Sequence, residues 1–246
     1  MKKINWRVKL GLGLVAASAV LMVVHYLIFR DLHHLAIYGF HEIAMMPIEV
    51  LFVTMILHSL LERRARQEML QKLNMVIGAF FSEVGSGLLH RISALDETVE
   101  VREHFLVSAA WDARRYETAR KAAAAYDYDV QATPEDLREL RTFIVEKRAF
   151  LLGLLQNPNL LEHKSFTDAL WAIFHLSEEL EHRSDFAGMP ESDRLHLTGD
   201  IKRAYAALAG EWLDYAQHLQ TAYPYLFSLA VRTNPLDSNA TVTVSS

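Results

Sequence analysis

The chain has 246 residues, of which 51% are hydrophobic, with 25 Lys and Arg against 30 Asp and Glu and no cysteine. The absence of cysteine excludes disulfide bonds, cysteine-ligated zinc or iron–sulfur centres, and cysteine nucleophiles. Residues 1–42 carry five basic and two acidic groups, whereas residues 43–246 carry 20 basic and 28 acidic groups. A body with a net charge of −8 is a poor polyanion binder, so no nucleic-acid partner is expected.

Two apolar stretches predict transmembrane helices. Residues 10–29 have no formal charge, and residues 43–61 contain one acid, Glu49. At 1.5 Å per residue, each stretch covers roughly 30 Å, the hydrocarbon thickness of a bilayer. A cleaved signal peptide is the alternative for the first stretch, because of its Lys-Lys start and small residues at 16–19. The apolar run continues past Ala19 to Phe29, which favours an uncut span.

Positive charge predicts the direction of the two spans. Basic residues precede the first stretch and follow the second, whereas the connection 30–42 contains one basic residue, Arg30. The positive-inside rule therefore predicts a multi-pass protein of the plasma (inner) membrane, with both termini cytoplasmic and a short outer loop at 30–42. The flanking basic residues are Lys2, Lys3, Arg7, Lys9, Arg63, Arg64, Arg66 and Lys72.

The apolar period after the second span is helical, which predicts an all-α fold. We expect a two-pass transmembrane helical hairpin in residues 1–67, a cytosolic helical bundle in 68–232 and a disordered tail in 233–246. Apolar residues step by three or four from Leu73 to Leu95, and the glycines between them predict a break or close packing near 82–87. An Ala-rich helix is expected over 97–127.

Later helices carry clearer end signals. Thr133 followed by Pro134 and two acids predicts a capped helix start, and Ser165 is the expected cap of the next helix. Apolar residues from Ile201 to Leu219 form a heptad-like stripe, which predicts either the seal of an intramolecular bundle or a subunit interface. Pro224 is expected to end or kink that helix.

The first candidate site is a cluster of ionisable residues around the outer loop. His25 and Glu49 are expected at similar depth in antiparallel spans, and a carboxylate in hydrocarbon needs a partner. His and carboxylate ligands suit protons or divalent cations, so the cluster predicts a proton or cation site. The alternative is a structural His25–Glu49 hydrogen bond with solvated loop histidines. The proposed site residues are His25, Glu49, His33, His34, His41 and Glu42.

The second candidate is Glu179 with His182, whose spacing is used in ferritin-like di-iron helices. On a helical wheel this pair lies away from the apolar stripe, together with His175 and Glu178. The last long helix has a similar polar face, made of His196, Asp200, Asp214 and His218. Such faces predict solvated surfaces, or a metal site only where two of them meet between subunits.

Small residues in the first span favour close helix packing. Gly13 and Ala17 form a small-xxx-small face, so a homo-oligomer within the lipid bilayer is expected. The leading hypothesis is a non-enzymatic, homo-oligomeric membrane protein that senses or conducts protons or cations through the outer cluster. The alternatives are a structural or partner-binding membrane scaffold and a membrane-anchored metalloenzyme using Glu179 and His182. No sequence motif identifies a cofactor.

Overall fold

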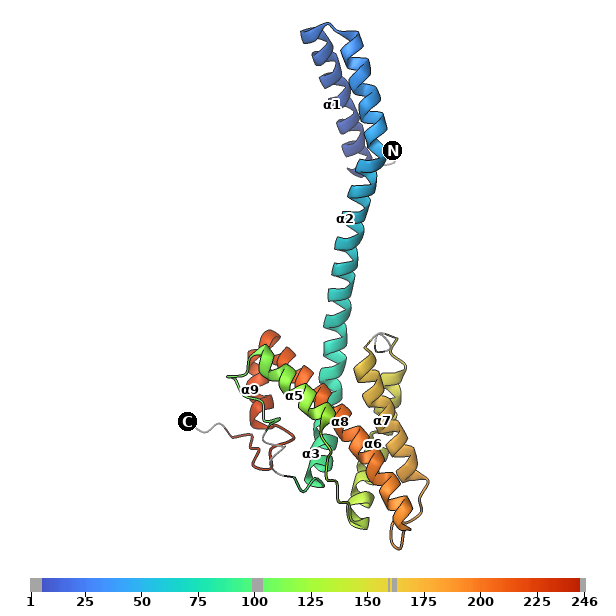
Figure 1. The fold of residues 1–246 in the computed structure, drawn as a ribbon, viewed down its shortest axis with the longest axis vertical. Helices are drawn as coiled ribbons and strands as arrows, with labels where there is room; N and C mark the ends of the chain where they lie inside the picture. The colour runs from blue at the N-terminus through green and yellow to red at the C-terminus, as the bar shows by residue number, and fades with distance from the viewer. Residues whose placement is uncertain (1–5, 99–103, 159, 161–162, 244–246) are drawn as a thin grey trace. The chain divides into compact units, whose positions relative to one another are not determined.

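The computed structural model describes residues 6–98, 104–158, 160 and 163–243 (Figure 1). The fold is all-helical, as predicted, and the chain divides into two compact units, Met1–Arg66 and Gln67–Ser246. Lys2 and Lys3, which contribute to the topology prediction, lie outside the described residues, as do tail residues 244–246.

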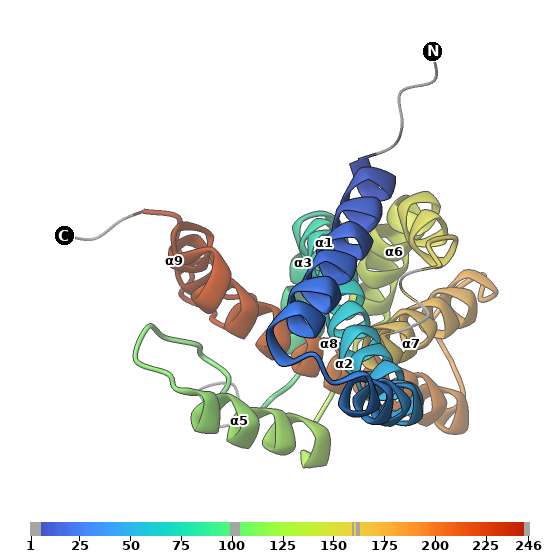
Figure 2. The same cartoon turned by 90° about the horizontal axis from the view of Figure 1, so that it is seen from above.

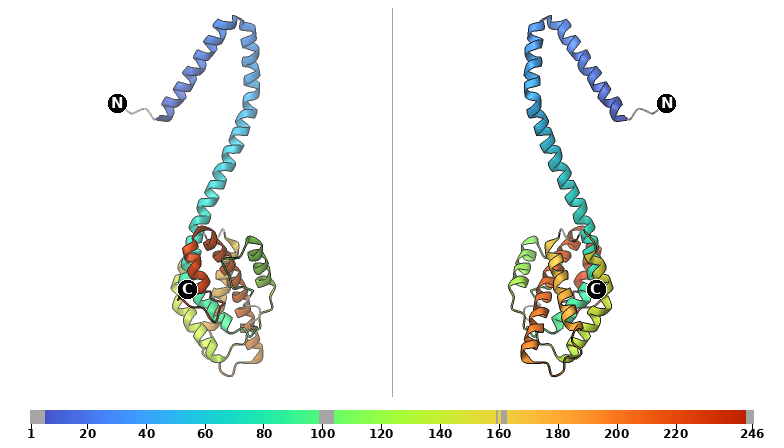
Figure 3. Two further views of the ribbon diagram at one scale, coloured as in Figure 1. Left: turned by 90° about the vertical axis from the view of Figure 1, so that its left-hand side faces the viewer. Right: turned by 90° about the vertical axis from the view of Figure 1, so that its right-hand side faces the viewer.

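The first unit is a helical hairpin with a very short connection. Helix α1 (Trp6–Phe29) is followed by α2 (Leu32–Phe80), whose residues belong to both units. Arg30 reverses the chain at a φ of 52°, and Asp31 Oδ1 accepts a hydrogen bond from the His34 amide at 3.0 Å. The two helices diverge from this turn (Figure 3). The expected 13-residue outer loop is therefore wrong as a loop, because helix α2 already begins at Leu32.

Both helices of this unit present apolar side chains to their surroundings. Val8–Phe29 and a window within Ala36–Ala94 have the length and apolarity of membrane-crossing helices, with mean hydropathies of 2.3 and 1.9. None of the residues in either window is buried within the chain itself.

The second unit begins with the end of α2, a π-helical turn η1 (Phe81–Gly85) and α3 (Ser86–Ala94). The π turn confirms the break expected near 82–87. A Cβ at Gly85 would lie 2.6 Å from Phe80 Cε1 and 2.7 Å from Phe81 Cδ1, so this turn depends on glycine. The apolar stripe is buried as expected: Leu73, Ile77, Phe80, Val84, Leu88 and Ile92.

The segment after α3 differs from the expected long Ala-rich helix. Helix α5 spans only Ala113–Ala125, capped by Asp112, which accepts a hydrogen bond from the Arg115 amide. Before it, the chain pairs with a distant segment: the Gln131 amide donates to the Leu95 carbonyl at 2.9 Å. Buried Asp96 accepts hydrogen bonds from two further amides through Oδ1. These bonds compete with local helix formation, so the helix start at 97 is wrong.

The remaining helices are α6 (Pro134–Leu155), α7 (Lys164–Glu181), α8 (Glu191–Ala222) and α9 (Pro224–Arg232). Thr133 caps α6 through a capping box, and Pro224 separates α8 from α9, both as expected. The cap of α7 lies two residues earlier than expected, because the His163 ring caps the helix and Ser165 lies inside it. Helix α8 contacts α5, α7 and α9 and lies centrally in the bundle (Figure 2).

The heptad-like stripe of α8 seals this bundle rather than a subunit interface. Its members Ile201, Tyr205, Leu208, Trp212 and Leu219 are buried within the single chain. The segment after α9 also packs, which corrects the expected disorder from residue 233. Asn234 and Leu236 are buried, and Asn234 Nδ2 donates to the Phe105 carbonyl at 3.4 Å. An apolar residue and a satisfied amide anchor this segment.

Candidate metal centre

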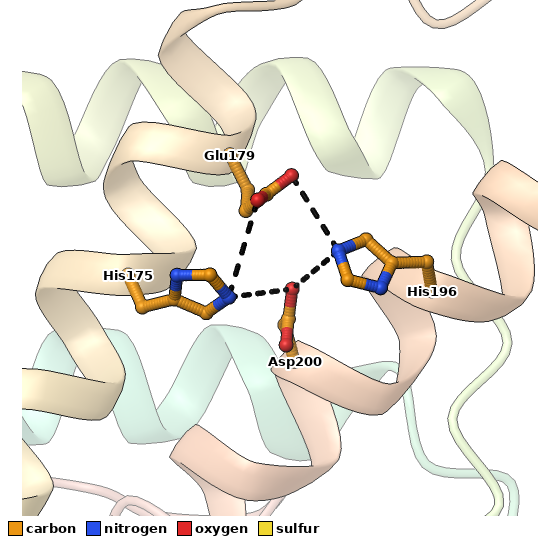
Figure 4. A group of neighbouring side chains, drawn as sticks. All are labelled: His175, Glu179, His196 and Asp200. Atoms are coloured by element: carbon orange, nitrogen blue, oxygen red, sulfur yellow. Dashed lines mark ion pairs between the residues drawn. The ribbon is translucent and has the colours of Figure 1, made fainter.

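Two pairs of side chains from adjacent helices converge on one point of the body. Helix α7 supplies His175 and Glu179, and α8 supplies His196 and Asp200. Each pair is spaced by four residues, so both members lie on the same helix face, one turn apart. Because α7 packs along α8, the two faces meet, and all four side chains point toward one another (Figure 4).

The distances among these groups are short and even. His175 Nε2 lies 3.4 Å from Asp200 Oδ2 and 4.0 Å from Glu179 Oε1. His196 Nε2 lies 3.4 Å from Asp200 Oδ2 and 3.6 Å from Glu179 Oε2. One ligand atom from each residue lies within 4.8 Å of the others. Four ligands held tetrahedrally at roughly 2.0–2.2 Å from a zinc ion lie roughly 3.3–3.6 Å apart, so small side-chain movements would complete such a sphere.

Asp200 is the inner member of the cluster. Its side chain is 3% exposed, whereas those of His175 and His196 are 46% and 52% exposed. Asp200 Oδ1 accepts a hydrogen bond from Arg203 Nη1 at 2.6 Å, but the buried Oδ2 has no hydrogen-bond partner. A buried carboxylate oxygen without a partner is unfavourable, so this atom requires a cation or a donor from the two imidazoles.

Glu179 is held from the outside by an arginine. Arg183 Nη1 lies 2.7 Å from Glu179 Oε2, and the other edge of the guanidinium contacts Asp193. The hydrogen bond from Arg183 lowers the pKa of Glu179, whereas burial raises it to a lesser degree. Glu179 is therefore an ionised carboxylate near neutral pH, ready to act as a ligand.

Family models match both parts of the chain. Residues 69–232 match the one described as the C-terminal helical domain of uncharacterized protein MJ1433, and residues 2–61 match the N-terminal helical domain of MJ1433. The chain belongs to the MJ1433 family. A relative from Methanocaldococcus jannaschii, "Uncharacterized protein MJ1433", is 38% identical over 233 residues, 95% of this chain and 94% of its own length. No solved structure matches the chain.

In this MJ1433-family chain, all four converging residues lie in the segment matched to the C-terminal helical domain. Glu179, a candidate from the sequence, belongs to the cluster. Its expected partner His182 does not: its ring Nδ1 lies 2.7 Å from the carbonyl oxygen of Glu178 at the end of α7. The two polar faces meet within one chain, whereas the sequence suggested contact only between subunits.

The outer cluster is not assembled within the single chain. The His25 ring packs on Phe29 at 4.8 Å, and Glu49 is exposed. Among the described residues, no hydrogen bond or ion pair joins His25 to Glu49. The His34 ring packs on Tyr38. Exposed positions on α2 are occupied by His33, His34, His41 and Glu42.

The small residues of α1 are also uncovered in the single chain. A Cβ added at Gly13 would meet nothing within 4 Å, and Ala17 is exposed. This face has room for the close approach of another helix.

A repeated pattern in the sequence could have revealed this four-residue cluster. His-x-x-x-acid occurs at 175–179 and again at 196–200, on two helices joined by a short connection. His and carboxylate one turn apart offer two ligands from one helix face. Sequence reasoning selected the i, i+3 pair Glu179–His182 and missed the two i, i+4 pairs.

Proposed function

We propose that this MJ1433-family protein is a two-pass integral membrane protein whose helical body binds a divalent first-row transition metal ion. The ligands are His175, Glu179, His196 and Asp200. The carrying observation is buried Asp200 Oδ2, which has no hydrogen-bond partner and faces two imidazole Nε2 atoms at 3.4 Å each. Two imidazoles with two carboxylates suit zinc, iron or manganese better than magnesium or calcium, which prefer oxygen ligands alone.

The proposal keeps cation binding as the function and moves it from the outer cluster to the body. The half-exposed histidines leave the ion in contact with solvent, which suits reversible binding and sensing. The alternative role of the cluster is a network of ion pairs between protonated histidines and the two carboxylates. At a pH where histidine is neutral, the metal site predicts binding of the ion, whereas the ion-pair network predicts none.

Membrane insertion is supported by the side chains of α1 and α2. A core helix of a soluble protein is mostly buried, whereas none of the two apolar windows is buried here. Basic residues flank the apolar stretches, which favours cytoplasmic termini and a cytoplasmic body. Exposed Glu49 would be unfavourable in lipid, and Gly13 and Ala17 favour helix packing, so the proposal includes a homo-oligomer.

Metal binding is tested with the full-length protein in detergent, stripped with a chelator and titrated with Zn²⁺ or Mn²⁺ at pH 8. We expect one tightly bound ion per chain. The double variant His175→Asn/His196→Asn should lose it, whereas the control His182→Asn should bind like the unmodified protein. Metal binding that survives the double variant, or no binding in the unmodified protein, would refute the metal site.

Topology is tested with single cysteines, because the chain has none of its own. Ala36→Cys, in the outer turn region, should react with an impermeant thiol reagent added to intact cells. Lys121→Cys, at an exposed position of α5, should react only after the cells are opened. Labelling of Lys121→Cys in intact cells would contradict the cytoplasmic placement of the body.

A further inference from the structure

Arg183 bridges two carboxylates beside the metal centre. Its Nη1 donates to Glu179 Oε2 at 2.7 Å and to the Glu179 carbonyl oxygen at 2.5 Å. Its Nε and Nη2 donate to the two oxygens of Asp193 at 3.1 and 2.6 Å. Arg183 follows the end of α7, and Asp193 lies in the first turn of α8. The guanidinium is therefore shared between a proposed metal ligand and an acid that is not one.

The Glu179 oxygen that Arg183 contacts, Oε2, is the nearer of the two to a histidine of the cluster. Both Glu179 oxygens face histidines of the cluster: Oε2 lies 3.6 Å from His196 Nε2, and Oε1 lies 4.0 Å from His175 Nε2. Arg203 is arranged differently, because it contacts Asp200 through Oδ1, whereas Oδ2 faces the two histidines. Of these two arginines, Arg183 contacts a carboxylate oxygen that itself faces a histidine of the cluster.

We infer that Arg183 competes with the metal ion for Glu179, and that Asp193 sets the strength of this competition. The inference rests on the proposed metal site and concerns its regulation. When metal coordinates Glu179 Oε2, the guanidinium shifts its hydrogen bonding toward Asp193, which already holds its other edge. Asp193 thus keeps Arg183 near the site without leaving it unpaired. The pair sets the metal concentration at which the site fills.

Simple electrostatics gives the size of the effect. A unit positive charge about 6 Å from a doubly charged ion in water-like surroundings weakens binding by about tenfold. The interaction is partly screened, so the effect should shrink as salt is raised. An arginine that only orients Glu179 would act in the opposite direction, because loss of such a supporting residue typically weakens metal binding.

The test measures the Kd of Zn²⁺ for the full-length protein in detergent, at pH 8 and low salt, by competition with a chelating dye. We expect Arg183→Gln to bind about tenfold more tightly, with a smaller gain at high salt. Arg183→Lys keeps the charge and should stay close to the unmodified protein. Arg194→Gln is the matched control, since Arg194 lies at the start of α8, as Asp193 does, but pairs with Glu191. It should leave the Kd unchanged.

Asp193 is tested in two backgrounds. Asp193→Asn alone should weaken Zn²⁺ binding several-fold, because Arg183 then has Glu179 as its remaining carboxylate. In the Arg183→Gln background the same change should have little effect, since Asp193 acts through Arg183. Thermal unfolding of each metal-free variant checks that the body remains folded.

The outcomes separate the two proposals. No Zn²⁺ binding by the unmodified protein would overturn the metal site and the competition with it. If the unmodified protein binds Zn²⁺ but folded Arg183→Gln has the same Kd or a higher one, the proposed competition is overturned and the metal site stands. An equal effect of Asp193→Asn in both backgrounds would show that Asp193 acts directly on the ion, which would overturn its role through Arg183.

Discussion

Glu211 of α8 makes the stability of the body depend on pH. Its side chain is 3% exposed, and its Oε2 has no hydrogen-bond partner. Burial raises the pKa of Glu211 from 4.5 to about 7, a hydrogen bond with Ser165 lowers it to a lesser degree, and nearby Asp214 raises it. The neutral acid is therefore the form that fits the folded protein. Replacing it with glutamine should remove this dependence.

The sign and size follow from proton linkage. Below a pH of about 4.5 both the folded and the unfolded chain hold the Glu211 proton, so this group contributes no pH dependence. As pH rises from 4.5 through 7, the unfolded chain releases the proton first, and the free energy of unfolding falls. A pKa raised from 4.5 to about 7 corresponds to a loss of about 3 kcal/mol above pH 7. In a chain of this size, that loss lowers the Tm by about 6–12 °C.

The assay is thermal unfolding of the full-length protein in detergent, followed by circular dichroism between pH 5 and pH 8. We expect the Tm of Glu211→Gln minus that of the unmodified protein to rise from pH 5 to about pH 7 and to level off towards pH 8. Glu139→Gln is the control, because Glu139 is an exposed acid, and its curve should run parallel to that of the unmodified protein. Parallel curves for Glu211→Gln as well would refute the assignment of a neutral buried acid.

Three further changes test the packing of the two units. Gly85→Ala should destabilise the body by about 1–3 kcal/mol in chemical unfolding, because its Cβ would overlap two buried phenylalanine rings, whereas Gly153→Ala in open space should be neutral or stabilising. Glu49→Gln should preserve the proposed oligomer in cross-linking if the carboxylate has only a structural role, and Glu49→Leu should weaken it by leaving its partner unpaired. Gly13→Leu with Ala17→Leu should reduce cross-linked oligomer without affecting membrane insertion, and an unchanged ladder would remove this interface.

End signals and buried stripes could be predicted because they depend on neighbouring residues. Thr133 and Asp136 cap α6 through contacts three residues apart, and the stripe of α8 follows the helical period. The turn at Arg30 could not be predicted in the same way. The expected loop was bounded by its charged residues, Arg30 and Glu42, but a charge ends an uncharged run without ending a helix, and α2 begins at Leu32.

Features that depend on distant segments were missed. The helix expected over 97–127 begins only at Ala113, and the described residues of this range before it are not helical. Leu95 and Asp96 instead hydrogen-bond with the segment around Asp129, which no local pattern reveals. The four-residue cluster of α7 and α8 was missed for a related reason. A helical wheel orients each helix against its own apolar stripe, and cannot show that the polar edges of α7 and α8 meet.

All four proposed ligands lie within residues 175–200, on two helices joined by a short connection. An ion bound there closes only a short loop of chain, so the entropy lost on bringing its ligands together is small. Short-range contacts of this kind form early, since they need no search over distant parts of the chain. During synthesis the complete ligand set leaves the ribosome before the rest of α8 and all of α9. Metal availability would therefore act on the nascent chain, by favouring the α7–α8 hairpin before the rest of the bundle has been made.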